Sequence, residues 1–150
     1  MSYLINFTWF VLGFWGMEVF SWAFHKYLMH GFLWSIHKTH HEKSKGFFEL
    51  NDVFSLLFGA IGFGLIYTGA ANWAWNFWLG LGISTYGAVY FILHDSLVHQ
   101  RFKTFPRPNN QLIQAIFEAH KTHHRTRGRD GAESFGLLLV SRKFFKKTKD

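Results

Sequence analysis

The sequence predicts an all-α integral membrane protein: a helical bundle with three transmembrane helices, a fourth span being left open, and a cytoplasmic histidine-rich helical cap. Three observations predict this class. Residues 53–94 contain no Asp, Glu, Lys or Arg, a run of 42 residues. The formal net charge of +7 is divided into −1 over residues 1–99 and +8 over residues 101–150. The ten histidines fall into four groups and occur nowhere else.

The first predicted span covers residues 4–24. This stretch is aromatic and aliphatic, and only Asn6, Thr8, Glu18 and Ser21 interrupt it. We expect a retained transmembrane helix and not a secretory signal peptide, because no Lys or Arg precedes the stretch and no small-residue cleavage site follows it.

The uncharged run predicts the second and third spans, residues 53–69 and 79–93. As a helix the run would extend about 63 Å, roughly twice the ~30 Å thickness of a bilayer core. Asn72 and Asn76, among Trp73, Trp75 and Trp78, mark the predicted turn, because Trp favours the membrane–water interface. A soluble helical core also contains uncharged segments, but 42 residues is a large part of a 150-residue chain.

The spans are rich in glycine, at positions 59, 62, 64, 80, 82 and 87. Small residues let helices approach closely in a membrane, so these positions predict tight helix packing. The GLG sequence at 80–82 lies inside an apolar run and lacks the strand-to-helix context of a phosphate-binding loop. A nucleotide site is therefore not expected.

Residues 25–52 and 94–150 form the predicted cap of a single domain, residues 1–150. Lys26, Lys38, Lys43 and Lys45 follow the first span, and twelve basic residues follow the third. With three spans both regions lie on one side, which the positive-inside rule makes cytoplasmic. We therefore expect the N-terminus outside and the C-terminus in the cytoplasm. Because topology explains the basic charge, no nucleic-acid partner is expected.

Two further apolar stretches lie in the cap, at residues 113–117 and 135–140. They are too short to cross a bilayer. They either insert into the membrane–water interface or pack within the cap.

The histidines come in two formats, each used twice. HxxxxH contains His25 and His30, then His94 and His99; HKTHH contains His37, His40 and His41, then His120, His123 and His124. Positions i, i+3 and i+4 share a helix face, so each HKTHH is expected to present three imidazoles to one point. In HxxxxH the two positions differ by about 140° on a regular helix. We therefore expect the first histidine on the last turn of a span and the second where the helix ends or unwinds.

This pattern predicts two metal ions. The chain has no cysteine, which excludes thiolate-ligated haem, cysteine-bound iron–sulfur clusters and cysteine zinc sites. Neutral imidazole suits iron, copper, zinc and nickel, and five histidines per half exceed the needs of one four-coordinate zinc. Isolated core histidines, a bis-imidazole haem and a metal transporter remain as alternatives, although no chain of polar residues crosses the spans.

Seven sequence blocks resemble the membrane di-iron hydroxylases of the fatty acid hydroxylase superfamily, and within it the bacterial beta-carotene 3-hydroxylases. They are GMEV at 16–19, HKYLMHG at 25–31, HKTHHE at 37–42, FELNDVF at 48–54, YGAVYFILHDSLVHQR at 86–101, AHKTHH at 119–124 and SFG at 134–136. The histidine pattern is shared with sterol and fatty acid hydroxylases, whereas NDVF and HDSLVHQR indicate the carotenoid branch. Gly131, Ala132 and Glu133 depart from the family, outside the histidine set.

The resemblance implies an oxygen-dependent hydroxylation at C3 of a β-ionone ring, from beta-carotene through cryptoxanthin to zeaxanthin. It also implies a location in the bacterial inner membrane. It implies two iron ions held by all ten histidines, and electrons from ferredoxin or a similar donor, because the chain has no haem, flavin or iron–sulfur site. Zinc in a purified sample would not argue against iron. The alternatives are a hydroxylase or desaturase of another lipid, such as a sterol or acyl chain, and a histidine-rich metal-binding membrane protein without redox chemistry.

Carboxylates near the histidines are candidates to accept the second ring N–H of a ligand. They are Glu42, Asp95 and Glu118, together with Asp52, which serves equally well as a helix cap. Glu18 shares a helix face with His25, about 10 Å deeper. It is a functional candidate or a neutral acid bonded to a neighbouring helix.

Two further sets of residues are assigned to partners. Tyr86 and Tyr90 lie in line with His94 and either line the substrate site or pack there. Six basic residues complement an acidic ferredoxin, or equally the headgroups of the membrane lipid: Arg101, Lys103, Arg107, Arg125, Arg127 and Arg129.

Overall fold

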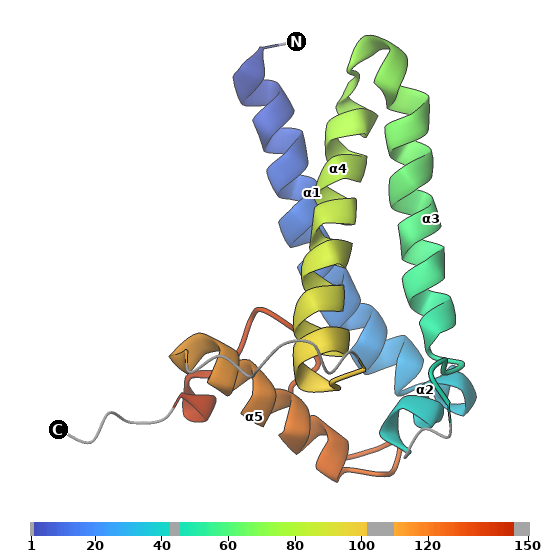
Figure 1. Cartoon of the computed structure of the whole chain (residues 1–150), viewed down its shortest axis with the longest axis vertical. Helices are drawn as coiled ribbons and strands as arrows, with labels where there is room; N and C mark the ends of the chain where they lie inside the picture. The colour runs from blue at the N-terminus through green and yellow to red at the C-terminus, as the bar shows by residue number, and fades with distance from the viewer. Residues whose placement is uncertain (1, 43–45, 102–109, 146–150) are drawn as a thin grey trace, which may run out of the picture.

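A computed structural model describes residues 2–42, 46–101 and 110–145, and every regular element within them is helical. Three long helices stand side by side. Apart from the short turn that joins the second and third of them, the other helices gather at the end away from the N-terminus (Figure 1). The α-helices are α1 (Tyr3–Ala23), α2 (Trp34–His41), α3 (Asp52–Gly69), α4 (Trp75–Tyr90) and α5 (Gln111–Arg125). The short helices are η1 (Phe24–Met29), η2 (Ala70–Asn72), η3 (Phe91–Val98) and η4 (Arg142–Phe144).

The three predicted spans are confirmed as helices long and apolar enough to cross a membrane. They run over Tyr3–Met29, Asp52–Asn72 and Trp75–Val98, and the described residues contain no fourth such helix. The third span begins four residues before the predicted start, because the turn is short. Trp73 adopts a left-handed conformation (φ 49°), and the helix resumes at Trp75. The Asn76 side chain, expected in the turn, reaches back from the first helical turn to donate to Thr68 Oγ1 at 3.0 Å.

Glycines bring α4 against both of its neighbours, as the sequence predicts. A Cβ on Gly82 would overlap the carbonyl oxygen of Phe10 on α1, and a Cβ on Gly80 would lie 2.7 Å from the carbonyl oxygen of Gly62 on α3. These close approaches make α4 the central helix of the three.

Gly82→Leu is expected to force α1 away from α4. Overpacking a close contact costs about 1–3 kcal/mol, so the thermal unfolding midpoint of the detergent-purified protein should fall by several degrees. Gly16→Leu is the matched control, because a Cβ on Gly16 meets no atom within 4 Å. Equal midpoints for the two variants would contradict the packing argument.

Spans one and three end in π-helical turns that contain His25 and His94, and His30 and His99 lie where these helices end, as the sequence predicts. The His30 N–H donates to the carbonyl oxygen of His25 at 3.0 Å, and the His99 N–H to that of His94 at 2.9 Å. An i→i+5 hydrogen bond closes each wide turn. Both histidines of a pair therefore face the same side, with ring centroids 5.3 Å apart for His25 and His30.

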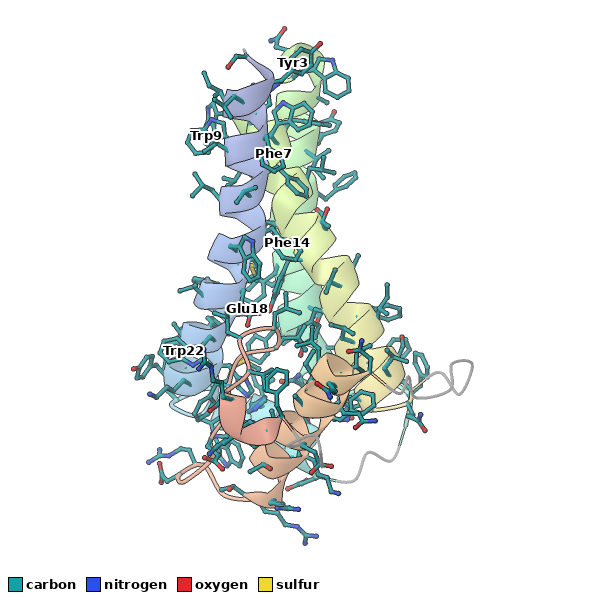
Figure 2. The ribbon with its side chains drawn as sticks, turned by 90° about the vertical axis from the view of Figure 1, so that its left-hand side faces the viewer. Tyr3, Phe7, Trp9, Phe14, Glu18 and Trp22 are labelled. Atoms are coloured by element: carbon teal, nitrogen blue, oxygen red, sulfur yellow. The ribbon has the colours of Figure 1, made fainter. Side chains whose placement is uncertain are left out.

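The two short apolar stretches pack within the cap. Residues 113–117 belong to α5, whose Ala115 and Ile116 are buried. Residues 126–140, called here the C-terminal segment, return to α1 beside Glu18 (Figure 2). Leu137 of this segment is buried.

Candidate metal centre

The described histidines form two clusters of converging ring nitrogens. The first cluster is His25, His30, His37, His41 and His123, and the second is His40, His94, His99 and His120. Within each cluster one nitrogen per residue lies within 4.8 Å of all the others. Both clusters lie at the cap end of the spans, where the π-helical turns end.

The HKTHH repeats divide their histidines between the two clusters, so the prediction that each repeat serves one point is wrong. His40 and His123, the i+3 residue of each repeat, join the cluster formed mainly by the other half of the chain. The reason is helical geometry: i+3 and i+4 differ by about 100° around the axis. Each repeat thus contributes one histidine to the cluster that contains the first histidine of the other repeat.

Backbone carbonyls set the tautomers of the first cluster. The Nδ1–H groups of His25, His30, His41 and His123 donate to the carbonyl oxygens of Phe135, Arg129, Thr126 and Glu133, at 2.8 to 3.0 Å. All four acceptors belong to the C-terminal segment. His37 Nδ1 bonds Asn51 Oδ1 at 2.8 Å. Each Nε2 atom therefore carries a lone pair directed at the others.

The Nε2 atoms are too close to one another without a cation between them. His37 Nε2 lies 3.0 Å from His25 Nε2 and 3.1 Å from His41 Nε2. Two lone pairs at this distance repel, because neither nitrogen carries a proton. A metal ion would be bound by these same lone pairs, so the first cluster fits the group that its residue types predict.

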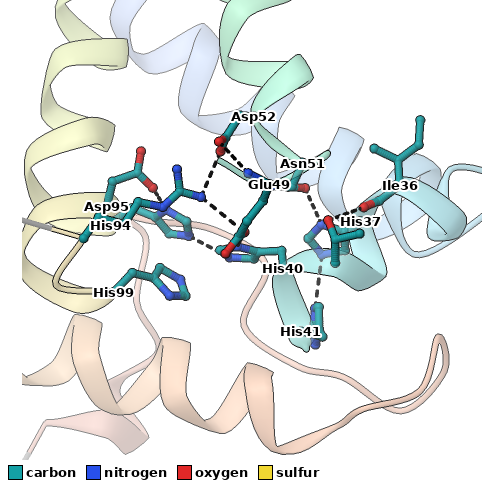
Figure 3. Close-up of polar contacts among 12 residues, drawn as sticks. Ile36, His37, His40, His41, Glu49, Asn51, Asp52, His94, Asp95 and His99 are labelled. Carbon is teal, nitrogen blue, oxygen red and sulfur yellow. Dashed lines mark hydrogen bonds and ion pairs between the residues drawn. The ribbon is translucent and has the colours of Figure 1, made fainter. Parts of the chain in front are cut away.

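Carboxylates set the tautomers in the second cluster. His40 Nδ1–H donates to Glu49 Oε2 at 3.0 Å, and His94 Nδ1–H donates to Asp95 Oδ1 at 2.8 Å. Figure 3 shows Glu49 between His40 and Asp52. The two clusters thus differ, because neutral acceptors support the first and carboxylates support part of the second.

Arg101 belongs to this carboxylate network. Its guanidinium lies 3.2 Å from Glu49 and 2.8 Å from Asp52, and its side chain is only 14% exposed. This position differs from the exposed docking position expected for Arg101. Asp52 neither caps α3 nor contacts a histidine: its Oδ2 accepts from the Glu49 N–H at 3.0 Å. Sequence reasoning missed Glu49, although it lies in the FELNDVF block.

His124 lies beside the second cluster. Its ring centroid is 4.4 Å from that of His120 and 4.7 Å from that of His40. Its Nε2 atom is buried without a hydrogen-bond partner among the described residues. A buried polar atom is normally satisfied, so this nitrogen is a further candidate ligand.

Burial keeps the histidines neutral. The loss of hydration lowers the pKa of His37 and His123 to about 3, of His41 and His99 to about 4, and of His124 to about 2. Neighbouring imidazoles add to the effect, because each disfavours a second positive charge nearby. Neutral imidazole is the form that binds metal.

Acidification is expected to destabilise the metal-free protein. The folded-state pKa values lie below the ordinary value of 6.5, so the unfolded chain takes up protons first. The stability from neutral histidines is complete above pH ~6.5 and is lost as the pH falls towards ~4. The unfolding midpoint of chelator-treated protein should therefore be lower at pH 5 than at pH 8. An unfolding midpoint that rises on acidification would refute the predicted direction of this pH dependence.

Glu18 is fully buried in α1 and holds four donors. Its Oε1 accepts the N–H groups of Leu137, Leu138 and Leu139 at 2.9 to 3.1 Å, and its Oε2 accepts the Tyr86 hydroxyl at 2.8 Å. The hydrogen bond from Tyr86 agrees with the predicted bond to a neighbouring helix, and the three backbone donors add a contact that the sequence does not predict. Glu18 thus ties the C-terminal segment to the bundle.

Other predicted site residues lie further out. Glu42 is exposed, and Glu118 lies 4.0 Å from Lys121; no hydrogen bond joins either carboxylate to a histidine in the described residues. Both line a cavity of about 670 Å³, together with His40, His99 and His120 of the second cluster. Arg125, Arg127 and Arg129 are exposed. Lys103 and Arg107 lie outside the described residues.

A second cavity, of about 310 Å³, connects the spans to both clusters. Histidines of both clusters line it, together with apolar and aromatic residues of all three long helices. Tyr86 and Tyr90 line it as well. The Tyr90 ring stacks on the His94 ring at 4.4 Å between centroids. A ligand in this cavity would meet the histidines at one end and apolar side chains along the rest.

Comparisons with known proteins agree in indicating one family. The family described as fatty acid hydroxylase matches residues 10–144. A beta-carotene hydroxylase of Pantoea ananas is 43% identical over 125 residues, 83% of this chain and 71% of that protein. A beta-carotene hydroxylase of Pseudescherichia vulneris is 40% identical over 91% of this chain and 78% of that protein. The chloroplastic beta-carotene 3-hydroxylase 2 of Arabidopsis thaliana is 39% identical over 83% of this chain and 42% of that protein. No solved structure matches the chain.

Proposed function

This chain belongs to the fatty acid hydroxylase family, and from that premise we propose that it is a membrane hydroxylase of carotenoid rings. It adds a hydroxyl group at C3 of the β-ionone rings of beta-carotene, giving cryptoxanthin and then zeaxanthin. The observation that carries this proposal is the apolar cavity that leads from the spans to both histidine clusters. The beta-carotene hydroxylases among its relatives support the choice of substrate.

We propose that each cluster holds one iron ion, through the Nε2 atoms described above, with His124 completing the second. When bound, two such ions activate dioxygen for insertion into an unactivated C–H bond. The protein orients its imidazoles through their Nδ1–H groups. Glu49 and Asp95 make the imidazoles of His40 and His94 stronger donors, and Arg101 balances the charge of Glu49.

The cavity supplies the surroundings for this chemistry. Its aromatic and aliphatic lining excludes water, which protects the reaction from side reactions. Tyr90 lies at the junction with the second cluster, its hydroxyl 3.3 Å from His94 Nε2. The proposal gives Tyr90 the role of placing the ring beside that cluster.

Electrons come from another protein in this proposal, ferredoxin or a similar donor. The exposed Arg125, Arg127 and Arg129 offer a basic surface to an acidic donor or to lipid headgroups. The whole chain acts as one domain in the bacterial inner membrane, with its cap in the cytoplasm. That orientation places the clusters on the side that a cytoplasmic donor reaches.

Reconstitution tests the function. Purified protein in lipid vesicles, loaded with iron, receives beta-carotene, ferredoxin, a ferredoxin reductase, NADPH and oxygen. Oxygen-dependent formation of cryptoxanthin and zeaxanthin is expected. Turnover of a sterol or acyl substrate alone would indicate the related lipid hydroxylases, and metal binding without oxygen consumption would indicate a metal-binding protein.

A further inference from the structure

The most exposed residues that line the cavity beside the clusters lie together at one place. Among its lining residues, the exposed ones are Ser55 and Gly59 on α3, Gly87 on α4 and Phe91 at the start of η3. The other lining residues are buried or half-buried. The exposed four lie on two neighbouring spans, so the cavity opens between α3 and α4.

The other sides of the cavity are closed by packing. Between the first span and α3, Phe24 of η1 contacts Phe54 and Phe58 edge-on, with centroids 5.4 and 5.2 Å apart. Between α1 and α4, the bond from Tyr86 to Glu18 joins the two helices directly. A ligand from the bilayer therefore meets an aromatic wall on one side and a hydrogen-bonded contact on the other.

Glycines determine where the opening begins. A Cβ on Gly62 would lie 2.7 Å from Ser84 Oγ, so α3 and α4 touch at this level. One helical turn nearer the cap, Gly59 and Gly87 occupy the corresponding positions, and a Cβ on either would meet no atom within 4 Å. The helices diverge towards the cap (Figure 1). The close contact at Gly62 thus lies one turn above the opening.

We propose that the gap between α3 and α4 is the opening through which the ring end of the substrate enters from the bilayer, and that Gly59 and Gly87 keep it wide. The inference rests on the proposed function and adds the route and the residues that determine which substrates pass. A volume of about 310 Å³ is at the lower end of the range for small-molecule sites. It suits one ring with a short part of its polyene, while the rest of the chain stays between α3 and α4 and in the lipid.

Leucine at position 59 is expected to narrow the opening without disturbing the fold. Gly64→Leu is the matched control, because Gly64 lies on the same helix, has open space around its Cα and does not line the cavity. Leucine is also the better helix former in both variants. We expect Gly59→Leu to lower kcat/KM for beta-carotene in vesicles by about tenfold or more, and Gly64→Leu to stay within about twofold of wild type. Both variants should bind the wild-type amount of metal.

A thiol-protection experiment tests binding apart from turnover. The chain has no cysteine, so Gly59→Cys and Gly64→Cys each carry a single thiol. Beta-carotene in the vesicles should slow the labelling of position 59 by a membrane-permeant thiol reagent, and should leave position 64 unaffected.

The outcomes separate the two proposals. If wild type hydroxylates beta-carotene and Gly59→Leu behaves like Gly64→Leu, the proposed opening between α3 and α4 is refuted. Equal protection of both thiols would overturn it as well. If beta-carotene protects position 59 but the wild type forms no hydroxylated product, the opening stands and the proposed function fails.

Discussion

His37→Ala is expected to remove one metal ion per chain and to abolish hydroxylation, with a loss of at least about 100-fold in rate. His37 is fully buried, and its Nε2 contacts those of both His25 and His41, so the first cluster loses its central nitrogen. Elemental analysis of purified protein and zeaxanthin formation in carotene-producing cells measure the two effects. Lys38→Ala, an exposed change on the same helix, is the control. Retention of both ions with full activity would refute the metal assignment.

Double variants test how the structure divides the histidines. His37 and His123 belong to one cluster, whereas His120 belongs to the other. His37→Ala with His123→Ala should therefore still bind about one metal ion per chain, and His37→Ala with His120→Ala should bind almost none. A division by sequence halves predicts almost no metal in either double variant, because each removes one histidine from each half. The metal content of His37→Ala with His123→Ala therefore distinguishes the two divisions.

Glu18→Ala is expected to have the largest effect on stability. It removes the acceptor of one buried and two part-buried backbone N–H groups, and one of the two partners of the Tyr86 hydroxyl, which keeps Ser21 Oγ at 2.8 Å. Each unsatisfied group costs about 1–3 kcal/mol, so a loss of about 3 kcal/mol or more in the free energy of unfolding is expected. The thermal unfolding midpoint in detergent measures it.

The same change should loosen the first cluster selectively. The C-terminal segment held by Glu18 also supplies the carbonyl acceptors of four first-cluster histidines, among them His25 and His123. Metal content should therefore fall towards one ion per chain at a temperature where the variant stays folded. Glu18→Gln keeps an acceptor oxygen and should retain most of the metal. Glu118→Gln, an exposed carboxylate paired only with Lys121 among the described residues, should behave as wild type; equal metal loss in all three variants would contradict this role.

Side-chain chemistry alone predicted much of the site. The histidine spacing indicated metal binding at the span ends, and Asp95 was correctly placed on a histidine. The contacts of Glu49 with His40 and of Arg101 with Glu49 could not be predicted. Both residues lie in loops between helices, and the sequence does not determine the path of these loops. The departure at Glu133 has a physical explanation as well. It supports His123 through its backbone carbonyl, which any residue provides.

The sequence by itself determined the three spans, because length and the absence of charge decide whether a segment crosses a bilayer. It also determined that nitrogen ligands gather where those spans end. Only the tertiary structure decided which histidines share a cluster, since that depends on the angle at which α2 and α5 meet the spans. It also decided that the HxxxxH pairs sit on widened turns: a π-helical turn forms where packing holds both imidazoles on one side, and no residue preference marks it in advance.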